Sequence, residues 1–499
     1  MLTFFLPAFL FFLIIGLPVF FALLVAPGAL LWLNGQERDI ALLYRNVYNG
    51  MDSFPLMALP FFILAGEIMN RGGITTRLVE FSQALMGHLR GGLAHVNILS
   101  SILFAGLSGS AVADTSALGS ALIPAMEKNK YSRKFAAAVT AASSVIGPII
   151  PPSGIMIIYA YVMGESVAAL FLAGIVPGVL VGAGLMAVVR LMADHHNLPK
   201  AERIVHKNQA ISPLEDRVSF VLLRMNLAGL LVALWAGVSA LMRAVAGVEV
   251  NLNGWVLFLI FLLPAHLLLR RVRAMVSPDF RIICKKAVAP LQTPIIILGG
   301  ILVGFFTPTE ASAIAVAYAL AISFFVLKSL KLPQLPGVLL RAAIASSTVL
   351  LLVGAAVAFK TVVSLSHAPQ QLASLILGLS ENPLILLFLI NMLLFVVGMF
   401  LDAGPAIIIL GPILGPIFID LGVHPVHFAM IMSVNLTVGL ATPPMGLVLF
   451  VASSVSGERV EAISRAILPF LAVEALVIFL ITYVPAISMT IPRLAGFVQ

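Results

Sequence analysis

FAGLSGSAVADTSALGSALIP (residues 104–124) and VTAASSVIGPIIPPSGIMIIYA (residues 139–160) form the stretch that decides the fold of this chain. In an otherwise apolar sequence, Gly, Ser, Thr and Pro gather in two short interruptions, around 108–115 and around 147–154. Neither interruption can belong to an unbroken helix. At membrane depth, broken backbone is tolerated only where it is buried in protein or lines a cavity. The two interruptions therefore predict a binding site inside a membrane protein.

A second copy of this pattern occupies residues 398–416, GMFLDAGPAIIILGPILGP, and 433–453, SVNLTVGLATPPMGLVLFVAS. Paired, interrupted apolar segments in two halves of a chain are typical of the binding site of a secondary transporter. Pro-kinked helices with small contact residues are the alternative, but both breaks would then have to recur together by accident. The copies share two spacings: Asp114 to Pro124 matches Asp402 to Pro412, and Gly147, Pro151, Pro152 and Gly154 match Gly439, Pro443, Pro444 and Gly446.

The composition is that of a polytopic membrane protein. Of 499 residues, 61% are hydrophobic and only 10% are charged. The formal charge of +8 does not indicate nucleic-acid binding, because the basic residues lie in short clusters between apolar segments, as membrane topology requires. The single cysteine, Cys284, excludes an intrachain disulfide. The first apolar run, at about 3–33, lacks a charged start and is too long for a signal peptide, so we expect a retained membrane helix. A mixed-charge loop that contains Glu37, Arg38, Asp39 and Arg45 should separate it from a second span at about 53–69, and further spans are expected at about 167–189 and 340–361.

The interruptions divide the chain into five predicted parts. Each copy should form a re-entrant hairpin followed by a broken helix, because arms at about 94–107, 115–126, 386–398 and 405–419 are too short to cross about 30 Å of hydrocarbon. An apolar pair at 219–270 has no such breaks and predicts scaffold. The predicted parts are scaffold helices at 1–93, a first transport repeat at 94–166, further scaffold at 167–385 including that pair, a second transport repeat at 386–456, and a C-terminal span at 457–499.

The distribution of Lys and Arg predicts the topology. With a cytoplasmic N-terminus and two re-entrant hairpins, 23 of the 29 basic residues lie in predicted inner loops, and only Arg38, Arg45 and Arg493 lie outside. This asymmetry follows the positive-inside rule. The first hairpin then opens to the inside and the second to the outside, so the two halves are inverted and the C-terminus is periplasmic.

Two acidic residues near predicted span ends each allow two interpretations. Glu67 is either a functional carboxylate in the membrane or, as we favour, the partner of Arg71 at a helix end. Glu310 follows Thr307 and Pro308, the signature of a capping box at a helix start, and we favour capping over cation binding.

The duplicated breaks suit a cation together with a carboxylate. Unwound backbone supplies carbonyl oxygens for an alkali cation, and the helix N-termini beyond the breaks offer N–H groups to an anion. Hydroxyl groups near the breaks are further candidates, although each is individually better explained as a helix-packing contact. They belong to Ser108, Ser110, Thr115, Ser143, Ser144, Thr437 and Thr442.

Four motifs, in this order, resemble the large membrane subunit of tripartite ATP-independent periplasmic (TRAP) transporters: FAGLSGSAVADTSALGSALIPAM, FAAAVTAASSVIGPIIPPSGIMIIY, GFFTPTEASA and GLATPPMGL. The resemblance covers nearly the whole chain. It implies an all-α, inverted-repeat, elevator-type fold in the bacterial inner membrane. It also implies a sodium-coupled importer of organic acids that works with a small membrane subunit and a periplasmic substrate-binding protein, without any other cofactor or transition metal.

The same resemblance implies ligand positions. Sodium is expected near Ser108, Gly147 and Ile150 in the first half, and near Gly398, Gly439, Thr442 and Met445 in the second. The tips and breaks would bind substrate through Ser110, Thr115, Pro151, Pro152, Asp402, Pro443 and Pro444. The first break ends in PPSG and the second in PPMG, which argues against direct ligation by the side chains of Ser153 or Met445.

Two other functions stay open on sequence grounds. A self-sufficient sodium/dicarboxylate symporter would share the hairpins and broken helices but need no binding protein. A membrane-embedded enzyme would need clustered acids, metal ligands or a nucleophile at membrane depth, whereas the histidines of this chain are scattered. The extra pair at 219–270 lengthens the chain beyond the usual large subunit and affects the surface where a small subunit would bind. The sequence does not indicate which acid is carried.

Overall fold

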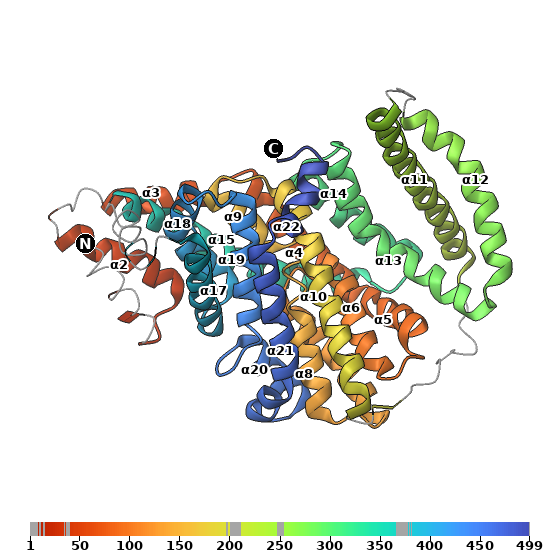
Figure 1. The fold of residues 1–499 in the computed structure, drawn as a ribbon, viewed down its shortest axis with the longest axis horizontal. Coiled ribbons are helices and arrows are strands. Elements are labelled where there is room, and N and C mark those ends of the chain that lie inside the picture. Colours follow the sequence, from red (N-terminus) through yellow and green to blue (C-terminus); the bar gives the residue numbers. More distant parts are fainter. Residues whose placement is uncertain are drawn as a thin grey trace.

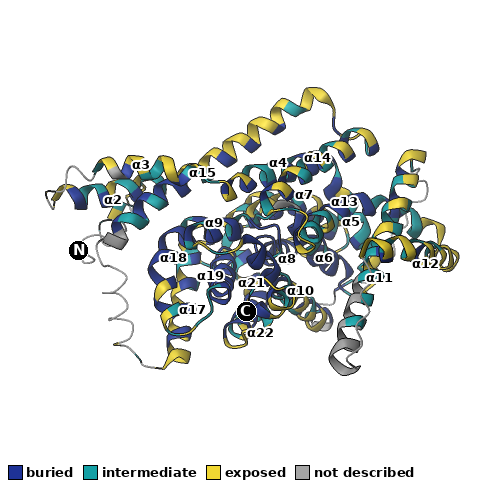
Figure 2. Ribbon diagram, turned by 90° about the horizontal axis from the view of Figure 1, so that it is seen from above, coloured by how far each residue is buried: buried dark blue, intermediate teal, exposed yellow. Residues whose placement is uncertain are grey.

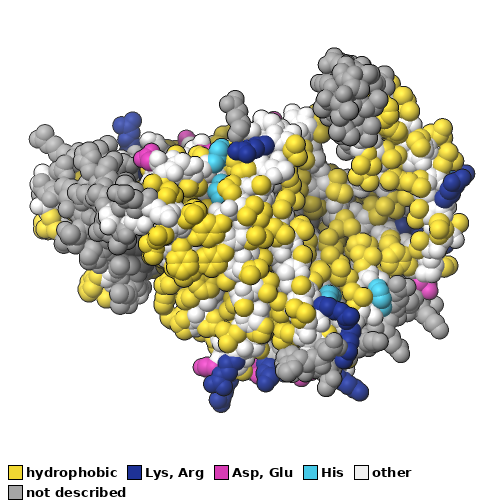
Figure 3. Space-filling model, in the orientation of Figure 1, with side chains coloured by type: hydrophobic (Ala, Val, Ile, Leu, Met, Phe, Trp, Pro, Cys, Tyr) yellow, Lys and Arg dark blue, Asp and Glu magenta, His cyan; other side chains and the backbone are white. Residues whose placement is uncertain are grey.

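The computed structural model describes residues 8, 11–12, 15–33, 35, 40–195, 198–199, 211–246, 254–365, 378, 380 and 382–498. Every element in these residues is a helix, so the all-α class is confirmed. By length and composition, eight described helices could cross a membrane, or nine if the bent pair Leu43–Met51 and Pro55–Arg71 forms one span. Figure 3 shows apolar side chains over the middle of one face and charged side chains near its upper and lower edges.

Five helices occur twice in the same order, which confirms the internal duplication. Each set holds a helical hairpin, a broken helix in two pieces and one long helix. The first set is α6 (Gly92–Ser108), α7 (Ala111–Lys128), α8 (Arg133–Ser144), α9 (Gly154–Met163) and α10 (Val167–His195). The second set is α17 (Pro383–Phe400), α18 (Ala403–Asp420), α19 (Pro425–Gly439), α20 (Leu447–Ser456) and α21 (Val460–Tyr483).

One register relates both halves. The residues that cap α7 and α18, Ser110 and Asp402, are 292 positions apart, and so are Gly147 and Gly439. Asp114 lies inside the first turn of α7, so its counterpart is Ala406. The predicted pairing of Asp114 with Asp402 is therefore wrong by about one helical turn.

The cause of this error is a second proline in α18. Pro412 and Pro416 both lie inside that helix, four residues apart, whereas α7 contains only Pro124. The spacing of ten residues fits Pro412, but the common register pairs Pro124 with Pro416.

The hairpin arms are longer than predicted. α17 and α18 contain 18 residues each, roughly 27 Å of helix, because only Leu401 and Asp402 lie between them. The first tip is equally short, with Gly109 and Ser110 between α6 and α7. The hairpins are thus defined by tight tips and not by short arms.

The broken helices form the centre of the molecule (Figure 2). Every residue of α8 from Phe135 onward and every residue of α19 from Val426 onward is buried. Small residues dominate α8, whose sequence is RKFAAAVTAASS, and they allow neighbouring helices to approach closely.

Buried polar side chains join each broken helix to its hairpin. Asn97 of α6 donates to Thr140 Oγ1 of α8 (2.6 Å), and Asn435 of α19 donates to Asn391 Oδ1 of α17 (2.6 Å). Polar groups satisfied in this way fix the position of one apolar helix against another.

A second group of helices lies beside the repeats. α4 (Ala58–Arg71) packs against α14 (Pro308–Ala321) and against α15 (Leu335–Leu365), which runs along the top of Figure 2. α2 (Val19–Leu33) and α3 (Ile40–Met51) pack against α15 as well. The remaining elements that link these helices are η2 (Pro55–Met57), α5 (Ile74–Met86), α13 (Pro278–Leu302), η3 (Ile322–Val326), η4 (Leu332–Gln334) and α22 (Ala486–Leu494).

Two expectations for the N-terminal region are wrong. The run at 3–33 is not one helix, because the described residues 15–18 form a turn before α2 begins at Val19. The mixed-charge segment that precedes the second span is not only a loop, since α3 forms within it and packs along α15. The predicted capping box is confirmed: Thr307 Oγ1 accepts from the Glu310 N–H (3.3 Å), and Glu310 Oε2 accepts from the Thr307 N–H (2.8 Å).

The extra apolar pair forms α11 (Pro213–Ala246) and α12 (Gly254–Met275), which stand at the upper right of Figure 1. α11 packs against α13, and ion pairs hold its first turn: Glu215 pairs with Arg77 of α5, and Asp216 pairs with Lys285 of α13. Ser219 Oγ also donates to the Lys285 carbonyl (2.7 Å). The pair is therefore fixed at one end to helices outside the two repeats.

Candidate functional site

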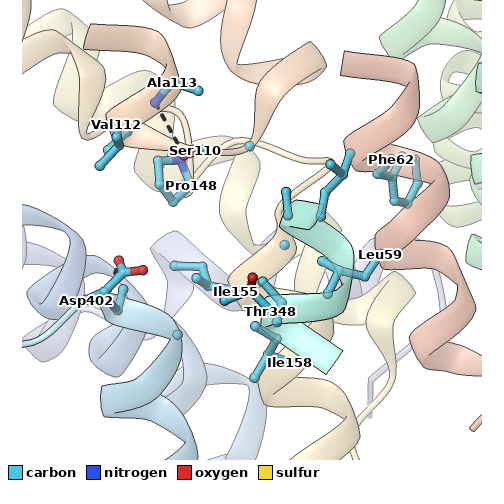
Figure 4. A pocket seen from close by; sticks show the side chains of 18 of the residues that line it. Leu59, Phe62, Ser110, Val112, Ala113, Pro148, Ile155, Ile158, Thr348 and Asp402 are labelled. Atoms are coloured by element: carbon cyan, nitrogen blue, oxygen red, sulfur yellow. Dashed lines mark hydrogen bonds between the residues drawn. The ribbon is translucent and has the colours of Figure 1, made fainter. Parts of the chain in front are cut away.

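A cavity of about 680 Å³ lies where the two halves meet the neighbouring helices (Figure 4). One wall comes from the hairpin tips and the first helix break, and the other from α2, α4 and α15. The residues from the repeats that line it are Phe104, Gly109–Ala113, Pro148, Pro152, Gly154, Ile155, Ile158, Asp402–Pro405 and Leu440.

The first hairpin tip reaches the cavity through a tight turn. Gly109 has φ +60°, a conformation that suits glycine, and a Cβ there would lie 2.8 Å from the Pro152 carbonyl oxygen. Ser110 then caps α7, with its Oγ accepting from the Ala113 N–H (3.4 Å). This local sequence brings the start of α7 against the first break.

The first break presents the start of α9 to the cavity. The Pro151–Pro152 bond is cis, and Ser153 caps α9 by accepting from the Met156 N–H (3.4 Å). Ser153 Oγ also donates to the Pro148 carbonyl (2.5 Å), which holds the unwound segment together. Because the first N–H groups of a helix have no intrahelical partner, this end of α9 favours an anion.

The second half contributes its tip more than its break. Asp402 lines the cavity and caps α18, accepting from the Ala403 N–H (2.8 Å). The Pro443–Pro444 bond is also cis, but only Leu440 of the second break lines the cavity. The starts of α7, α9 and α18 therefore converge on one cavity.

Glycines allow the closest backbone approach in each half. A Cβ on Gly439 would lie 2.5 Å from Cα of Gly398, so α17 and α19 touch through backbone atoms. In the first half, a Cβ on Gly147 would overlap Oδ2 of the fully buried Asp114. These contacts place carbonyl and carboxylate oxygens close together, which is the donor type that an alkali cation prefers.

Hydroxyl groups surround the first break. Thr115 Oγ1 donates to Ser144 Oγ (2.7 Å), and Ser101 Oγ donates to Ser143 Oγ (2.9 Å). All four side chains are buried. They bind one another in this structure, as the helix-packing interpretation of these hydroxyls requires.

The neighbouring helices also supply polar cavity residues. Glu67 of α4, one of the two acidic residues singled out from the sequence, lines the cavity, together with Asn70 of α4 and Thr348 of α15, which the sequence did not indicate. Glu67 Oε2 accepts from Nε of Arg341 on α15 (3.1 Å), so the predicted pairing with Arg71 is wrong. Glu67 and Arg71 share one helix end, but Arg341 reaches Glu67 from a helix 274 positions away.

The structure distributes the predicted ligands over several places. Of the substrate set, Ser110, Pro152 and Asp402 line the cavity, whereas Thr115 is buried beside it. Pro151 is buried, and Pro443 and Pro444 are more exposed.

Of the predicted sodium ligands, Gly398 and Gly439 are in contact, and Thr442 is buried with its Oγ1 donating to the Val438 carbonyl (2.9 Å). Met445 is 52% exposed. Gly147 and Ile150 lie together in the first break, and the side chain of Ser108 lies outside the described part of the chain.

Comparison with known proteins gives a family match along almost the entire chain. The family model described as the DctM component of tripartite ATP-independent periplasmic transporters matches residues 6–487. An uncharacterized protein, YgiK, of Salmonella typhimurium is 37% identical over 482 residues, which cover 96% of this chain and 94% of that protein. The C4-dicarboxylate TRAP transporter large permease protein DctM of Pseudomonas aeruginosa is 34% identical over 469 residues, covering 94% and 93%.

The fold is also similar to a solved structure. The crystal structure of the Alcanivorax borkumensis YdaH transporter aligns with a TM-score of 0.53 over 92% of this chain and 89% of that chain. Sequence identity in this alignment is 16%, so the likeness concerns the fold alone.

Proposed function

The chain belongs to the DctM-component family of tripartite ATP-independent periplasmic transporters, and from this premise we propose that it is the membrane permease of a sodium-coupled, binding-protein-dependent importer of organic acids. The observation that carries the proposal is the cavity of about 680 Å³ on which three helix starts from both halves converge. A site built from helix starts and unwound backbone, near the middle of inverted repeats, is the usual arrangement in secondary transporters.

The substrate class follows from the electrostatics of the cavity. The starts of α7 and α9 carry partial positive charge, which favours a carboxylate, whereas the start of α18 is already capped by the carboxylate of Asp402. Apolar side chains such as Leu59, Phe62 and Ile155 form much of the remaining wall, so the acid can carry a carbon skeleton. C4-dicarboxylates, sugar acids and related anions are the candidates.

Sodium would bind beside this cavity at the two breaks. Its ligands would be backbone carbonyls and hydroxyls around Gly147 in the first half and around Gly398, Gly439 and Thr442 in the second. The close glycine contact of α17 with α19 supports this assignment, because carbonyl oxygens can then converge on one point. A bound cation would also offset the negative charge of an arriving carboxylate.

Transport would proceed by an elevator movement. The two hairpins and two broken helices would move as one unit against α2, α4 and α15, whose side chains form the other cavity wall. On α4 the cavity extends from Leu59 to Asn70, so it reaches the end of this helix that the positive-inside rule places toward the cytoplasm. We therefore assign this structure to an inward-facing state.

The proposed setting is the bacterial inner membrane, with the N-terminus cytoplasmic and the C-terminus periplasmic. A small membrane subunit and a periplasmic substrate-binding protein would complete the transporter, and the binding protein would determine most of the specificity. The family match supports this assembly.

Reconstitution tests the proposal. A panel of C4-dicarboxylates and sugar acids is first screened for thermal stabilisation of the cognate binding protein. Uptake of the stabilising acid is then measured in proteoliposomes with and without sodium, and with and without that protein. We expect uptake only when both are present. Sodium-driven uptake without the binding protein would instead identify a self-sufficient symporter, and uptake independent of sodium would contradict the proposed coupling.

A further inference from the structure

Lys360 joins the proposed moving unit to the helices beside it. It lies on α15, within a span, and its Nζ donates to the Val162 carbonyl of α9 (2.5 Å). Basic residues inside membrane segments are rare and usually have a function. Arg224 makes a similar bond to the Leu262 carbonyl (3.2 Å), but both of these residues belong to the extra pair. The Lys360 bond differs because it crosses the boundary between the two groups of helices.

The bond involves the end of α9 that lies away from the cavity. Val162 is one residue from the C-terminus of α9, where carbonyl groups lack intrahelical partners and carry partial negative charge. Gly154 and Ile155, at the start of α9, line the cavity. The two ends are roughly 12 Å apart, at 1.5 Å per residue.

Lys360 also lies on nearly the same face of α15 as the residues that line the cavity, but further along the helix. Ala345, Thr348, Val349 and Leu352 of α15 line the cavity. Lys360 is eleven residues beyond Val349, roughly 16 Å along the helix, and three helical turns return it to nearly the same face. A displacement of the unit along α15 by about the length of α9 would therefore bring the cavity, instead of Val162, to Lys360.

We propose that Lys360 exchanges partners during transport: it binds the Val162 carbonyl in this state, and after the unit has moved outward it binds the carboxylate of the acid in the cavity. This inference rests on the proposed elevator movement. When no acid is bound, the carboxylate of the moving unit that lines the cavity is that of Asp402.

Electrostatic interactions make this exchange of partners depend on whether the acid is bound in the cavity. At the cavity, the ammonium would face the positive starts of α7 and α9, which are capped by serines, so an anion is needed between them, whereas the start of α18 is already capped by the carboxylate of Asp402. The carboxylate of the acid supplies that charge. Arg341, which lies one turn before the cavity residue Ala345 on α15, is already paired with Glu67. In the part of the chain that the structure describes, Lys360 donates to a neutral carbonyl, which an ionised partner can replace.

The first test follows the position of the unit without substrate. Val112, which lines the cavity, is changed to cysteine in a Cys284→Ser background, and an impermeant maleimide is applied from each side of proteoliposomes. Because the Val162 bond holds the inward state, Lys360→Met should raise the outside labelling rate by about tenfold, the effect of losing one charged hydrogen bond. Lys360→Arg should change it little. Arg224→Met is the matched control and should leave it unchanged.

The second test measures uptake of the panel acid that stabilises the cognate binding protein. Lys360→Met should raise the KM for the loaded binding protein, and Lys360→Arg should restore most of the loss. Unchanged labelling and unchanged KM in Lys360→Met would overturn the exchange. If position 112 never changes sides in the unsubstituted protein, the elevator movement itself is wrong, and the proposed function fails together with the exchange. Size-exclusion profiles establish that each variant is folded.

Discussion

At the scale of single residues, the contact between Gly398 and Gly439 sets the geometry of the second break. The two glycines face one another from α17 and α19, and backbone atoms form the contact. A side chain at either position would have to displace a helix and not merely another side chain. The contact therefore gives a sharp test of the proposed cation site.

We predict that Gly439→Ala abolishes sodium-dependent uptake. The added Cβ would lie 2.5 Å from Cα of Gly398, and the strain of such overpacking is typically about 1–3 kcal/mol. The measurement is uptake together with stabilisation of the purified protein by sodium. Gly299→Ala is the control, because no atom lies within 4 Å of a Cβ there. Full uptake by Gly439→Ala would remove this contact from the site.

The sequence predicts one wall of the cavity and, of the opposite wall, only Glu67. Ser110, Pro152 and Asp402 belong to the tips and breaks, which helix breakers mark locally and which the family resemblance assigns to substrate. Asn70 and Thr348 lie within regular helices, and no local pattern distinguishes them from packing residues. They reach the cavity only because α4 and α15 pack beside the repeats. Residues of this kind become predictable only when the packing of distant helices is known.

At the scale of elements, α14 shows how a local motif determines a helix start. Thr307 and Glu310 satisfy each other's backbone N–H groups at the end of a span. The motif was predicted from sequence because capping depends on residues only three positions apart. Separate substitutions of these two residues distinguish the capping interpretation of Glu310 from the cation-binding interpretation.

We predict that Thr307→Ala lowers the free energy of unfolding by about 1 kcal/mol, the usual effect of losing a threonine N-cap. Glu310→Gln should leave the sodium dependence of uptake unchanged, because an amide oxygen can still accept the capping bond. Thermal unfolding in detergent and uptake against sodium are the measurements. Thr490→Ala is the control, since among the described residues Thr490 bonds within its own helix (Thr490 Oγ1 to Ala486 O, 2.6 Å). A weaker sodium response in Glu310→Gln would favour the cation role.

The two breaks together predict a sodium stoichiometry above one. Each half has its own interrupted helix and its own hairpin, so each half can form a cation cavity. Uptake in proteoliposomes, measured against external sodium with the partner proteins supplied, should therefore give a Hill coefficient above one. A coefficient of one would mean that one break alone binds the coupling ion.

The elements themselves were predicted with uneven success, for physical reasons. Long apolar runs predicted spans such as α10 and α15 well, because burial in lipid leaves a strong compositional signal. α3 was missed, since a short amphipathic helix with charged neighbours resembles a loop in composition. The pairing of Asp114 with Asp402 is wrong because α18 contains two prolines one helical turn apart, Pro412 and Pro416. Pro124 of α7 can be aligned with either of them, and the spacing of ten residues from an aspartate fits Pro412.

At the scale of the whole molecule, the division into moving and stationary parts stays a prediction. The extra pair is fixed to α5 and α13 by ion pairs of Glu215 and Asp216. The tips and breaks form the opposite wall of the cavity from α4 and α15. This arrangement agrees with a stationary role for α11 and α12.

We predict that position 110 changes sides during transport and that position 231 does not. Ser110→Cys and Leu231→Cys, each in a Cys284→Ser background, are compared for accessibility from both sides, with and without sodium and substrate. Ser110 lines the cavity, whereas Leu231 belongs to the anchored α11. If both positions shift together, or if position 110 stays on one side throughout, the division is wrong.

The constant spacing of 292 residues relates the hairpin tip and the helix break of one half to those of the other. From the hairpin tip to the helix break, each half contains the same number of residues: Ser110 to Gly147 and Asp402 to Gly439 are both 37 positions. One added residue in this interval would rotate everything after it by roughly 100°. The connection between the halves, by contrast, contains α11 and α12, which lie outside both repeats. We therefore expect insertions, such as those made for labelling, to be tolerated in the connection between the halves. An insertion between the hairpin tip and the helix break would instead misalign the two.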